Sequence, residues 1–72
     1  MSAYTLKQIK TFQKVATLQS ISKAANALFV TQPAVTQQIK QLEEAFGLAL
    51  IEPFGRTVQL TESGKIFFKL SE

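Results

Sequence analysis

The sequence predicts a small, mostly α-helical domain in which three helices form the core, followed by a short two-stranded β-hairpin and the start of a last helix. Three observations support this prediction. Apolar residues recur at three- and four-residue intervals over separate stretches of the first 46 residues. A Ser or Thr suited to capping a helix precedes each stretch. After Gly47 the pattern changes to short alternating segments around Gly55, which is typical of a hairpin.

The composition limits the classes of function. The 72 residues suffice for one domain, and an apolar content of 46% is that of a folded protein. The absence of cysteine excludes disulfides and thiolate zinc sites. Histidine and aspartate are also absent, which leaves only five glutamates as common metal ligands. We therefore expect no metal and no other cofactor.

Positive charge gathers in the front part of the chain. The first 42 residues carry five lysines and no acidic residue, whereas the remainder carries three basic and five acidic residues. A basic, acid-free segment favours a polyanionic partner. Lysines that only keep a small protein soluble explain the same charge, so charge alone leaves both explanations open. No apolar run approaches the ~20 residues that span a bilayer, and the N-terminus lacks a signal peptide, which predicts a cytoplasmic location without membrane contact.

The first two helices are predicted from caps and apolar spacing. Thr5 is expected to cap a helix over about residues 6–19, whose Lys7, Lys10 and Lys14 share a side that is either solvated or a basic row. Its predicted core stripe consists of Leu6, Ile9, Phe12, Val15 and Ala16. Ser20 is expected to cap a shorter helix over residues 21–28, in which small alanines allow close approach of a neighbouring helix.

The third helix is predicted over residues 32–46, with Thr31 as its cap, Pro33 in its first turn and Gly47 as its left-handed end. Its apolar stripe consists of Val35, Ile39, Leu42 and Phe46. At 100° per residue, the opposite side is polar and mostly uncharged, and consists of Pro33, Thr36, Gln37, Lys40 and Glu44.

The remaining chain predicts a hairpin and a last helix. Leu48, Leu50 and Ile51 are expected to begin a strand, residues 53–56 to form a turn, and residues 57–60 to form the second strand. Thr61 is expected to cap a helix from Glu62 that contains Ile66, Phe67, Phe68 and Leu70. These apolar residues are nearly consecutive, so they cannot all face the same side of a helix. We expect some of them in the core and the others in an interface. The chain stops without a helix stop signal, and we expect the natural protein to continue.

Two short helices, a turn and a third helix match the helix-turn-helix layout. A helix of this kind fits the DNA major groove, where base edges offer both donors and acceptors. Gln32, Thr36 and Gln37 carry groups that suit those edges, and Arg56 at the hairpin tip suits the DNA backbone or minor groove. An ordinary solvated face and a solvated turn explain the same residues, so the pattern leaves DNA reading open.

The ordered motifs resemble those of the LysR-type transcriptional regulators. The resemblance lies in SISKAANAL at residues 20–28, TQPAVTQQI at residues 31–39, Leu42-Glu43, Gly47, and VQLTESG at residues 58–64. It covers about residues 4–70, nearly the whole chain. The resemblance implies a winged helix-turn-helix that binds promoter DNA in bacteria and therefore lies at the nucleoid. It divides the chain into a DNA-binding domain over residues 1–64 and the beginning of a linker and dimerisation helix over residues 65–72.

The resemblance also assigns residues. Recognition-helix positions that touch DNA in the family correspond to Thr31, Gln32, Pro33, Thr36 and Gln37, and the wing position corresponds to Arg56. Lys40 is added as a phosphate contact. The linker helix of the family pairs two subunits, which places Ile66, Phe67 and Leu70 at dimerisation and predicts a homodimer or tetramer of the full-length protein. A small-molecule effector would bind only a domain absent from this chain.

The sequence departs from the family at three places. Ile51 and Pro53 stand where the family commonly has a phenylalanine and an arginine, which puts one wing contact and the wing shape in doubt. Gln37 stands where the family often has an arginine. An uncharged side chain that can hydrogen-bond to bases thus replaces a positively charged one.

Two other classes of function compete with DNA binding. An enzyme is disfavoured because His, Cys and Asp are absent, and because Glu43 and Glu44 point about 100° apart on a helix. No Gly-rich phosphate loop is present. A winged helix used only for protein contacts remains the alternative, since a fold does not fix a function. It is disfavoured by the acid-free front half and by the polar Gln/Thr helix face.

Overall fold

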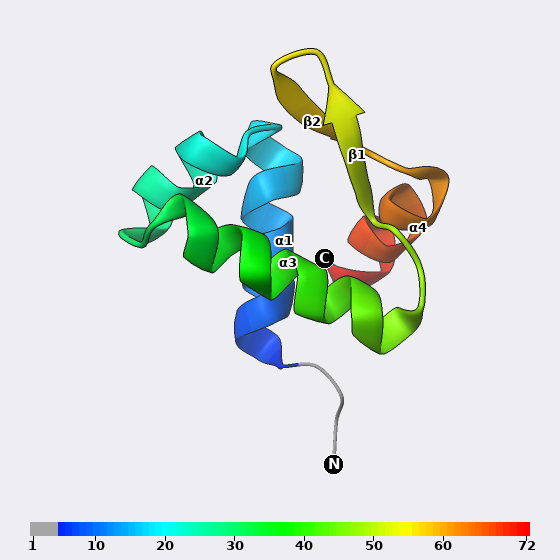
Figure 1. Ribbon diagram of the computed structural model, residues 1–72. Coiled ribbons are helices and arrows are strands. Elements are labelled where there is room, and N and C mark those ends of the chain that lie inside the picture. The colour runs from blue at the N-terminus through cyan, green and yellow to red at the C-terminus, as the bar shows by residue number, and fades with distance from the viewer. Residues whose placement is uncertain (1–4) are drawn as a thin grey trace.

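The computed structural model describes residues 5–72 as a winged helix-turn-helix, which confirms the predicted fold (Figure 1). Its elements are α1 (Leu6–Leu18), α2 (Ile21–Leu28), α3 (Gln32–Phe46), β1 (Ile51–Phe54), β2 (Thr57–Leu60) and α4 (Glu62–Ser71). Residues 1–4, which the predicted first domain includes, lie outside the described residues. The predicted boundary between residues 64 and 65 falls inside α4.

Each helix begins at a side-chain cap that satisfies a free backbone N–H group. Thr5 and Gln8 form a reciprocal capping box, with Thr5 accepting from the Gln8 N–H at 3.2 Å and Gln8 Oε1 accepting from the Thr5 N–H at 2.9 Å. Ser20, Thr31 and Thr61 cap the other three helices in the same way. All four predicted caps are confirmed, as is the left-handed end of α3 at Gly47, which has φ 68°.

The core lies where α1, α2 and α3 meet. It consists of Phe12, Val15, Ala24, Ala25, Val35, Ile39, Leu42 and Leu50, and Phe67 and Phe68 of α4 pack against it. The inclusion of Leu6 in the predicted core was wrong, because its side chain is 66% exposed. The start of α1 extends beyond α3 (Figure 1), and Leu6 is the first residue of that helix. Phe46, at the end of the α3 stripe, is only partly covered.

The hairpin begins later than predicted. Leu48 is in the loop, and Pro53 and Phe54 belong to β1 rather than to the turn. The register pairs Ile51 with Leu60 and Phe54 with Thr57, which leaves a two-residue loop with Gly55 at φ 62°. The prediction of Pro53 in the turn is wrong because both strands of a two-stranded sheet are edge strands, where a missing N–H is tolerated. Pro53 therefore does not prevent the wing from forming.

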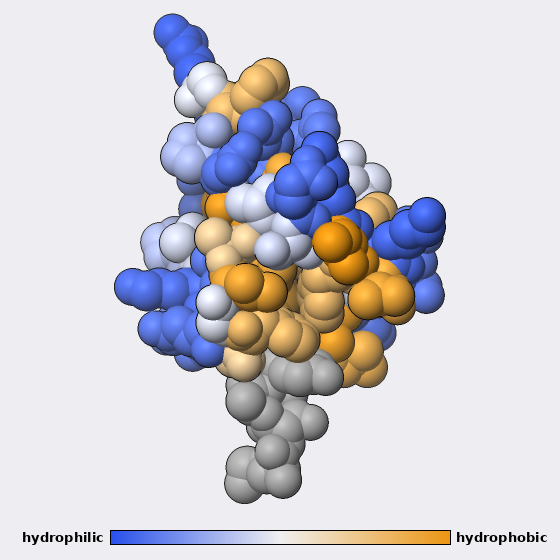
Figure 2. Space-filling view, turned by 90° about the vertical axis from the view of Figure 1, so that its right-hand side faces the viewer, coloured by the Kyte–Doolittle hydropathy of each residue, from blue (hydrophilic) through white to orange (hydrophobic). Residues whose placement is uncertain are grey.

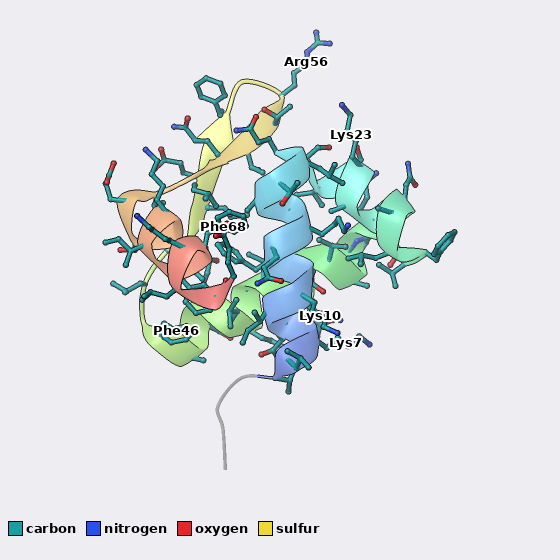
Figure 3. All side chains as sticks on the ribbon, turned by 180° about the vertical axis from the view of Figure 1, so that it is seen from behind. Lys7, Lys10, Lys23, Phe46, Arg56 and Phe68 are labelled. Atoms are coloured by element: carbon teal, nitrogen blue, oxygen red, sulfur yellow. The ribbon has the colours of Figure 1, made fainter. Side chains whose placement is uncertain are left out.

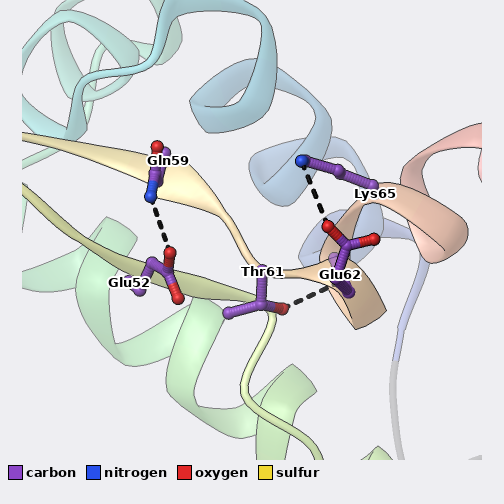
Figure 4. A network of polar contacts seen from close by, with 6 residues as sticks. Glu52, Gln59, Thr61, Glu62 and Lys65 are labelled. Atoms are coloured by element: carbon purple, nitrogen blue, oxygen red, sulfur yellow. Dashed lines mark hydrogen bonds and ion pairs between the residues drawn. The ribbon is translucent and has the colours of Figure 1, made fainter.

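The loop before β1 and the start of α4 are joined by a close backbone contact. The Thr61 hydroxyl donates to the Ala49 carbonyl at 2.6 Å and accepts from the Gly64 N–H at 2.9 Å. The Thr61 N–H donates to the Leu50 carbonyl at 3.1 Å. Figure 4 shows Thr61 at this junction, beside the Glu52–Gln59 hydrogen bond across the hairpin and the Lys65–Glu62 ion pair. Gly64 lies directly against the Leu50 backbone.

Substituting Gly64 tests this junction. A Cβ at position 64 would overlap the Leu50 carbonyl oxygen and lie 2.9 Å from its carbonyl carbon, both of which are backbone atoms. We expect Gly64→Ala to lower the free energy of unfolding by more than about 2 kcal/mol, measured by urea denaturation. Gly47→Ala is the control, since it faces open space and only its positive φ is strained, at a cost of about 1 kcal/mol. Equal losses for the two variants would contradict the close contact.

Candidate nucleic-acid interface

The helix α3 has one buried and one exposed side. Val35, Ile39 and Leu42 are each at most 2% exposed and hold the helix in the core. The residues assigned to DNA on the other side are all exposed, and they are Thr31, Gln32, Pro33, Thr36, Gln37 and Lys40. The core therefore presents a rigid helix with a free polar face, which is the requirement for groove insertion.

Hydrogen bonds divide the four glutamines of α3 into two groups. Gln38 accepts from the Thr11 hydroxyl of α1 at 2.7 Å, and Gln41 accepts from the Gln8 amide at 2.9 Å. The side chains of Gln32 and Gln37 are exposed and make no hydrogen bond to another residue in the described part of the chain. Two glutamines thus tie α3 to α1, whereas the other two keep their donors and acceptors for an outside partner.

The start of α3 is suited to an anion. The Thr31 hydroxyl oxygen accepts a hydrogen bond from the Ala34 N–H at 3.3 Å, and Pro33 has no N–H to satisfy. The positive end of the helix dipole remains exposed there, because Thr31 and Gln32 are both at the surface. Such a helix end attracts a phosphate group.

Basic side chains flank α3 without internal partners. Between residues 5 and 72 the structure records a single ion pair, Lys65–Glu62 at 3.4 Å, so Lys23, Lys40 and Arg56 are not neutralised by a neighbour. Figure 3 shows Arg56 extending from the hairpin tip, with Lys23 of α2 toward the same end of the molecule. Lys7 and Lys10 lie near the start of α1. Lys23 is not among the residues assigned to DNA from the sequence; only the fold shows that it lies toward the same end of the molecule as Arg56.

Phe29 is an exposed aromatic residue with an unusual backbone conformation at the end of α2. It ends α2 in the left-handed conformation, with φ 60°, and its side chain is 94% exposed. Its backbone N–H donates to the Asn26 carbonyl at 3.3 Å. A large non-glycine residue rarely adopts this conformation, and here no burial compensates the cost.

The last helix carries an apolar surface. Ile66 and Leu70 are 62% and 79% exposed and line a groove of about 250 Å³ together with Phe46 and Leu48. Apolar side chains gather on the face seen in Figure 2. Phe67, which was assigned to dimerisation with them, is half-buried, with its ring centroid 5.3 Å from that of Phe12 and 4.9 Å from that of Phe46. The ring is therefore used inside this chain, and Ile66 and Leu70 form the exposed pair.

Other kinds of site find no support in the described part of the chain. Residues 5–72 contain no group of three metal-ligating side chains and no helix long and apolar enough to cross a membrane.

A three-helix core with an exposed polar third helix and a basic-tipped hairpin defines a winged helix-turn-helix protein. Residues 6–65 match the family described as "Bacterial regulatory helix-turn-helix protein, lysR family". Because this match covers most of the chain, the chain belongs to the LysR family. This confirms the resemblance found in the sequence.

Relatives in the family are transcription regulators. The chain is 44% identical over its whole length to the HTH-type transcriptional activator CmpR of a Synechocystis species, covering 24% of that protein. It is 43% identical over 67 residues, 93% of the chain, to the RuBisCO operon transcriptional regulator of Allochromatium vinosum, covering 22% of it. The chain therefore spans about a quarter of the length of these relatives.

Solved structures of the family share the fold. The chain superimposes on BenM_DBD in its complex with catB site 1 DNA with a TM-score of 0.88 at 36% identity, covering 93% of this chain and 74% of that one. Full-length CbnR in complex with its target DNA gives a TM-score of 0.85 at 35% identity, covering 90% of this chain and 23% of that one.

Replacing Phe29 by asparagine tests the strain at the end of α2. Asparagine tolerates the left-handed conformation, and no buried contact is lost because Phe29 is exposed. We expect Phe29→Asn to raise the free energy of unfolding by about 0.5–1 kcal/mol in urea denaturation. Phe54→Asn serves as the comparison, because Phe54 is also exposed but lies in a strand without positive φ. A loss of stability in Phe29→Asn would show that the ring contributes more than its backbone costs.

Proposed function

We propose that this chain is the sequence-specific DNA-binding domain of a bacterial transcription regulator, with α3 inserted in the major groove. The exposed, unpaired polar face of α3, opposite a buried side, is the observation that carries the proposal. Solved family members of the same fold in complex with DNA support it. The regulators among its relatives give no indication of catalysis.

Each exposed residue has a role suited to its chemistry. The amides of Gln32 and Gln37 each donate and accept, which fits the two hydrogen-bonding groups of an adenine edge, and the Thr36 methyl fits a thymine methyl. Thr31 and Pro33 place the positive end of α3 against a phosphate. Lys40 neutralises a second phosphate, and Arg56 contacts the backbone or the minor groove beside the wing.

Gln37 directs part of the specificity in this proposal. The family often has an arginine at this position, and arginine prefers guanine edges. An uncharged glutamine reads adenine instead and contributes no phosphate attraction. The affinity of this domain for any duplex then depends more on Lys23, Lys40 and Arg56, which carry no internal ion pair.

The whole protein is proposed to act as a homodimer or tetramer at promoter DNA in the bacterial cytoplasm. Two copies that pair through the helix beginning at α4 would place their α3 helices in successive major grooves, ~34 Å apart. A small-molecule effector would act through a further domain, since the relatives are about four times as long as this chain.

A pair of substitutions on α3 tests the proposed roles. Gln32→Ala removes a base contact, so we expect it to weaken binding by roughly 1–3 kcal/mol on a duplex selected from a random pool, and much less on a scrambled one. Lys40→Ala removes a phosphate contact, so it should weaken binding to both duplexes equally. The slope of log affinity against log salt concentration should become shallower by about one. Fluorescence anisotropy at several salt concentrations measures both effects.

Gln41→Ala is the matched control, because Gln41 lies on the same helix but is bonded to α1. We expect it to leave the preference between the two duplexes unchanged. Equal losses on both duplexes for Gln32→Ala would remove Gln32 from the base-reading residues. Absence of binding to every duplex at low salt would instead favour a winged helix used for protein contacts.

The exposed apolar pair on α4, Ile66 and Leu70, predicts that the chain associates with itself. We expect the chain to form dimers at high concentration in analytical ultracentrifugation, and the double variant Ile66→Lys/Leu70→Lys to be monomeric, because two charges would then face the apolar groove. Leu6→Lys is the control, since Leu6 is a similarly exposed apolar residue on α1. A strictly monomeric parent chain, or unchanged association in the double variant, would contradict this interface.

A further inference from the structure

Glu43 connects the recognition helix to the wing. It lies on α3 and is half-buried, and its Oε2 atom accepts the N–H of Leu50 at 2.7 Å and the N–H of Ile51 at 3.2 Å. A single carboxylate oxygen thus holds the two residues at which the chain enters β1. Hydrogen bonds from backbone N–H groups to an ionised carboxylate are stronger than those between neutral groups.

The entry to β1 is held from two sides. The Leu50 N–H donates to Glu43 of α3, whereas the Leu50 carbonyl accepts from the N–H of Thr61, the residue that caps α4. The Leu50 side chain is 1% exposed and belongs to the core. The base of the hairpin is therefore fixed in position and direction, and Glu43 is its polar connection to the helix that carries the proposed base contacts.

Small changes at this entry are enlarged at the tip. Arg56 lies in the loop that follows Phe54, and three strand residues beyond Ile51 bring the hairpin to this loop, a distance of roughly 10 Å. A rotation of about 10° at the entry would move the backbone of the tip by roughly 1.5–2 Å over that length. Such a movement exceeds the tolerance of a hydrogen bond, which weakens beyond about 3.2 Å between heavy atoms.

We propose that Glu43 is a positioning residue of the wing, which sets the angle between the hairpin and α3 so that Arg56 meets DNA when α3 lies in the groove. This inference rests on the proposed function, in which α3 and Arg56 both contact one duplex. Glu43 itself touches no DNA in this arrangement, because its carboxylate is directed at the Leu50 and Ile51 backbone. Its effect on binding passes through Arg56.

A double-mutant cycle between Glu43 and Arg56 tests this inference. In the parent chain we expect Arg56→Ala to weaken binding of a selected duplex about tenfold, measured by anisotropy at low salt. In a Glu43→Ala background, where the wing has lost its direction, the same substitution should weaken binding less than about twofold. Glu43→Gln should restore the full Arg56 effect, because an amide oxygen accepts the same two N–H groups.

Two further variants separate positioning from charge and from stability. Glu44 is exposed on the same helix, and its side chain makes no hydrogen bond or ion pair within residues 5–72. Glu44→Ala therefore removes an equal charge and should leave the tenfold Arg56 effect intact. Glu43→Asp keeps the charge but shortens the side chain by one methylene, so it should reduce the Arg56 effect even if Glu43→Ala does not fold. Circular dichroism at the assay temperature confirms that each variant tested is folded.

The outcomes distinguish the inference from the function on which it rests. A tenfold Arg56 effect that persists in folded Glu43→Ala and Glu43→Asp would overturn the positioning role and leave DNA binding by α3 and Arg56 standing. The absence of any Arg56 effect in the parent chain would overturn the proposed wing contact, and the positioning role with it. Loss of the effect in Glu43→Ala with recovery in Glu43→Gln supports the inference.

Discussion

The packing of α3 against α1 is the interaction on which the rest of the structure depends. Val35, Ile39 and Leu42 share one buried cluster with Phe12 and Val15 of α1. Bonds from Gln8 and Thr11 to the glutamines of α3 fix the rotation of α3 about its own axis, because they join both helices at two successive turns. That rotation determines which side chains of α3 face outward, and therefore which can meet DNA.

The wing depends on the same helix through a different contact. Glu43 holds the entry to β1, and the absence of a side chain at Gly64 lets α4 approach the Leu50 backbone. The hairpin base thus lies between the end of α3 and the start of α4, with Ile51, Val58 and Leu60 packed on the core. The contacts therefore fix the positions of α3, the wing and α4 relative to one another. Simultaneous contact with a groove and with its flanking backbone requires such a fixed arrangement.

Local sequence patterns succeeded wherever a single element was enough to decide the outcome. Thr5, Ser20, Thr31 and Thr61 were identified as caps because a cap acts within one helical turn. Predictions failed where the outcome depended on whether another element lies against the residue. The spacing of Leu6 fits the core stripe, but Leu6 is the first residue of α1 and its side chain stays exposed. Pro53 resembled a turn residue, but its strand has a free edge.

The sequence by itself determined the helices, their caps, the polar side of α3 and the family, because these follow from residue spacing and from ordered motifs. Only the tertiary structure decided which glutamines of α3 remain free, since Gln38 and Gln41 differ from Gln32 and Gln37 solely in facing α1. It also decided that Phe67 packs inward while Ile66 and Leu70 remain exposed. In each case the physical reason is the same: a side chain's availability depends on what another segment places against it.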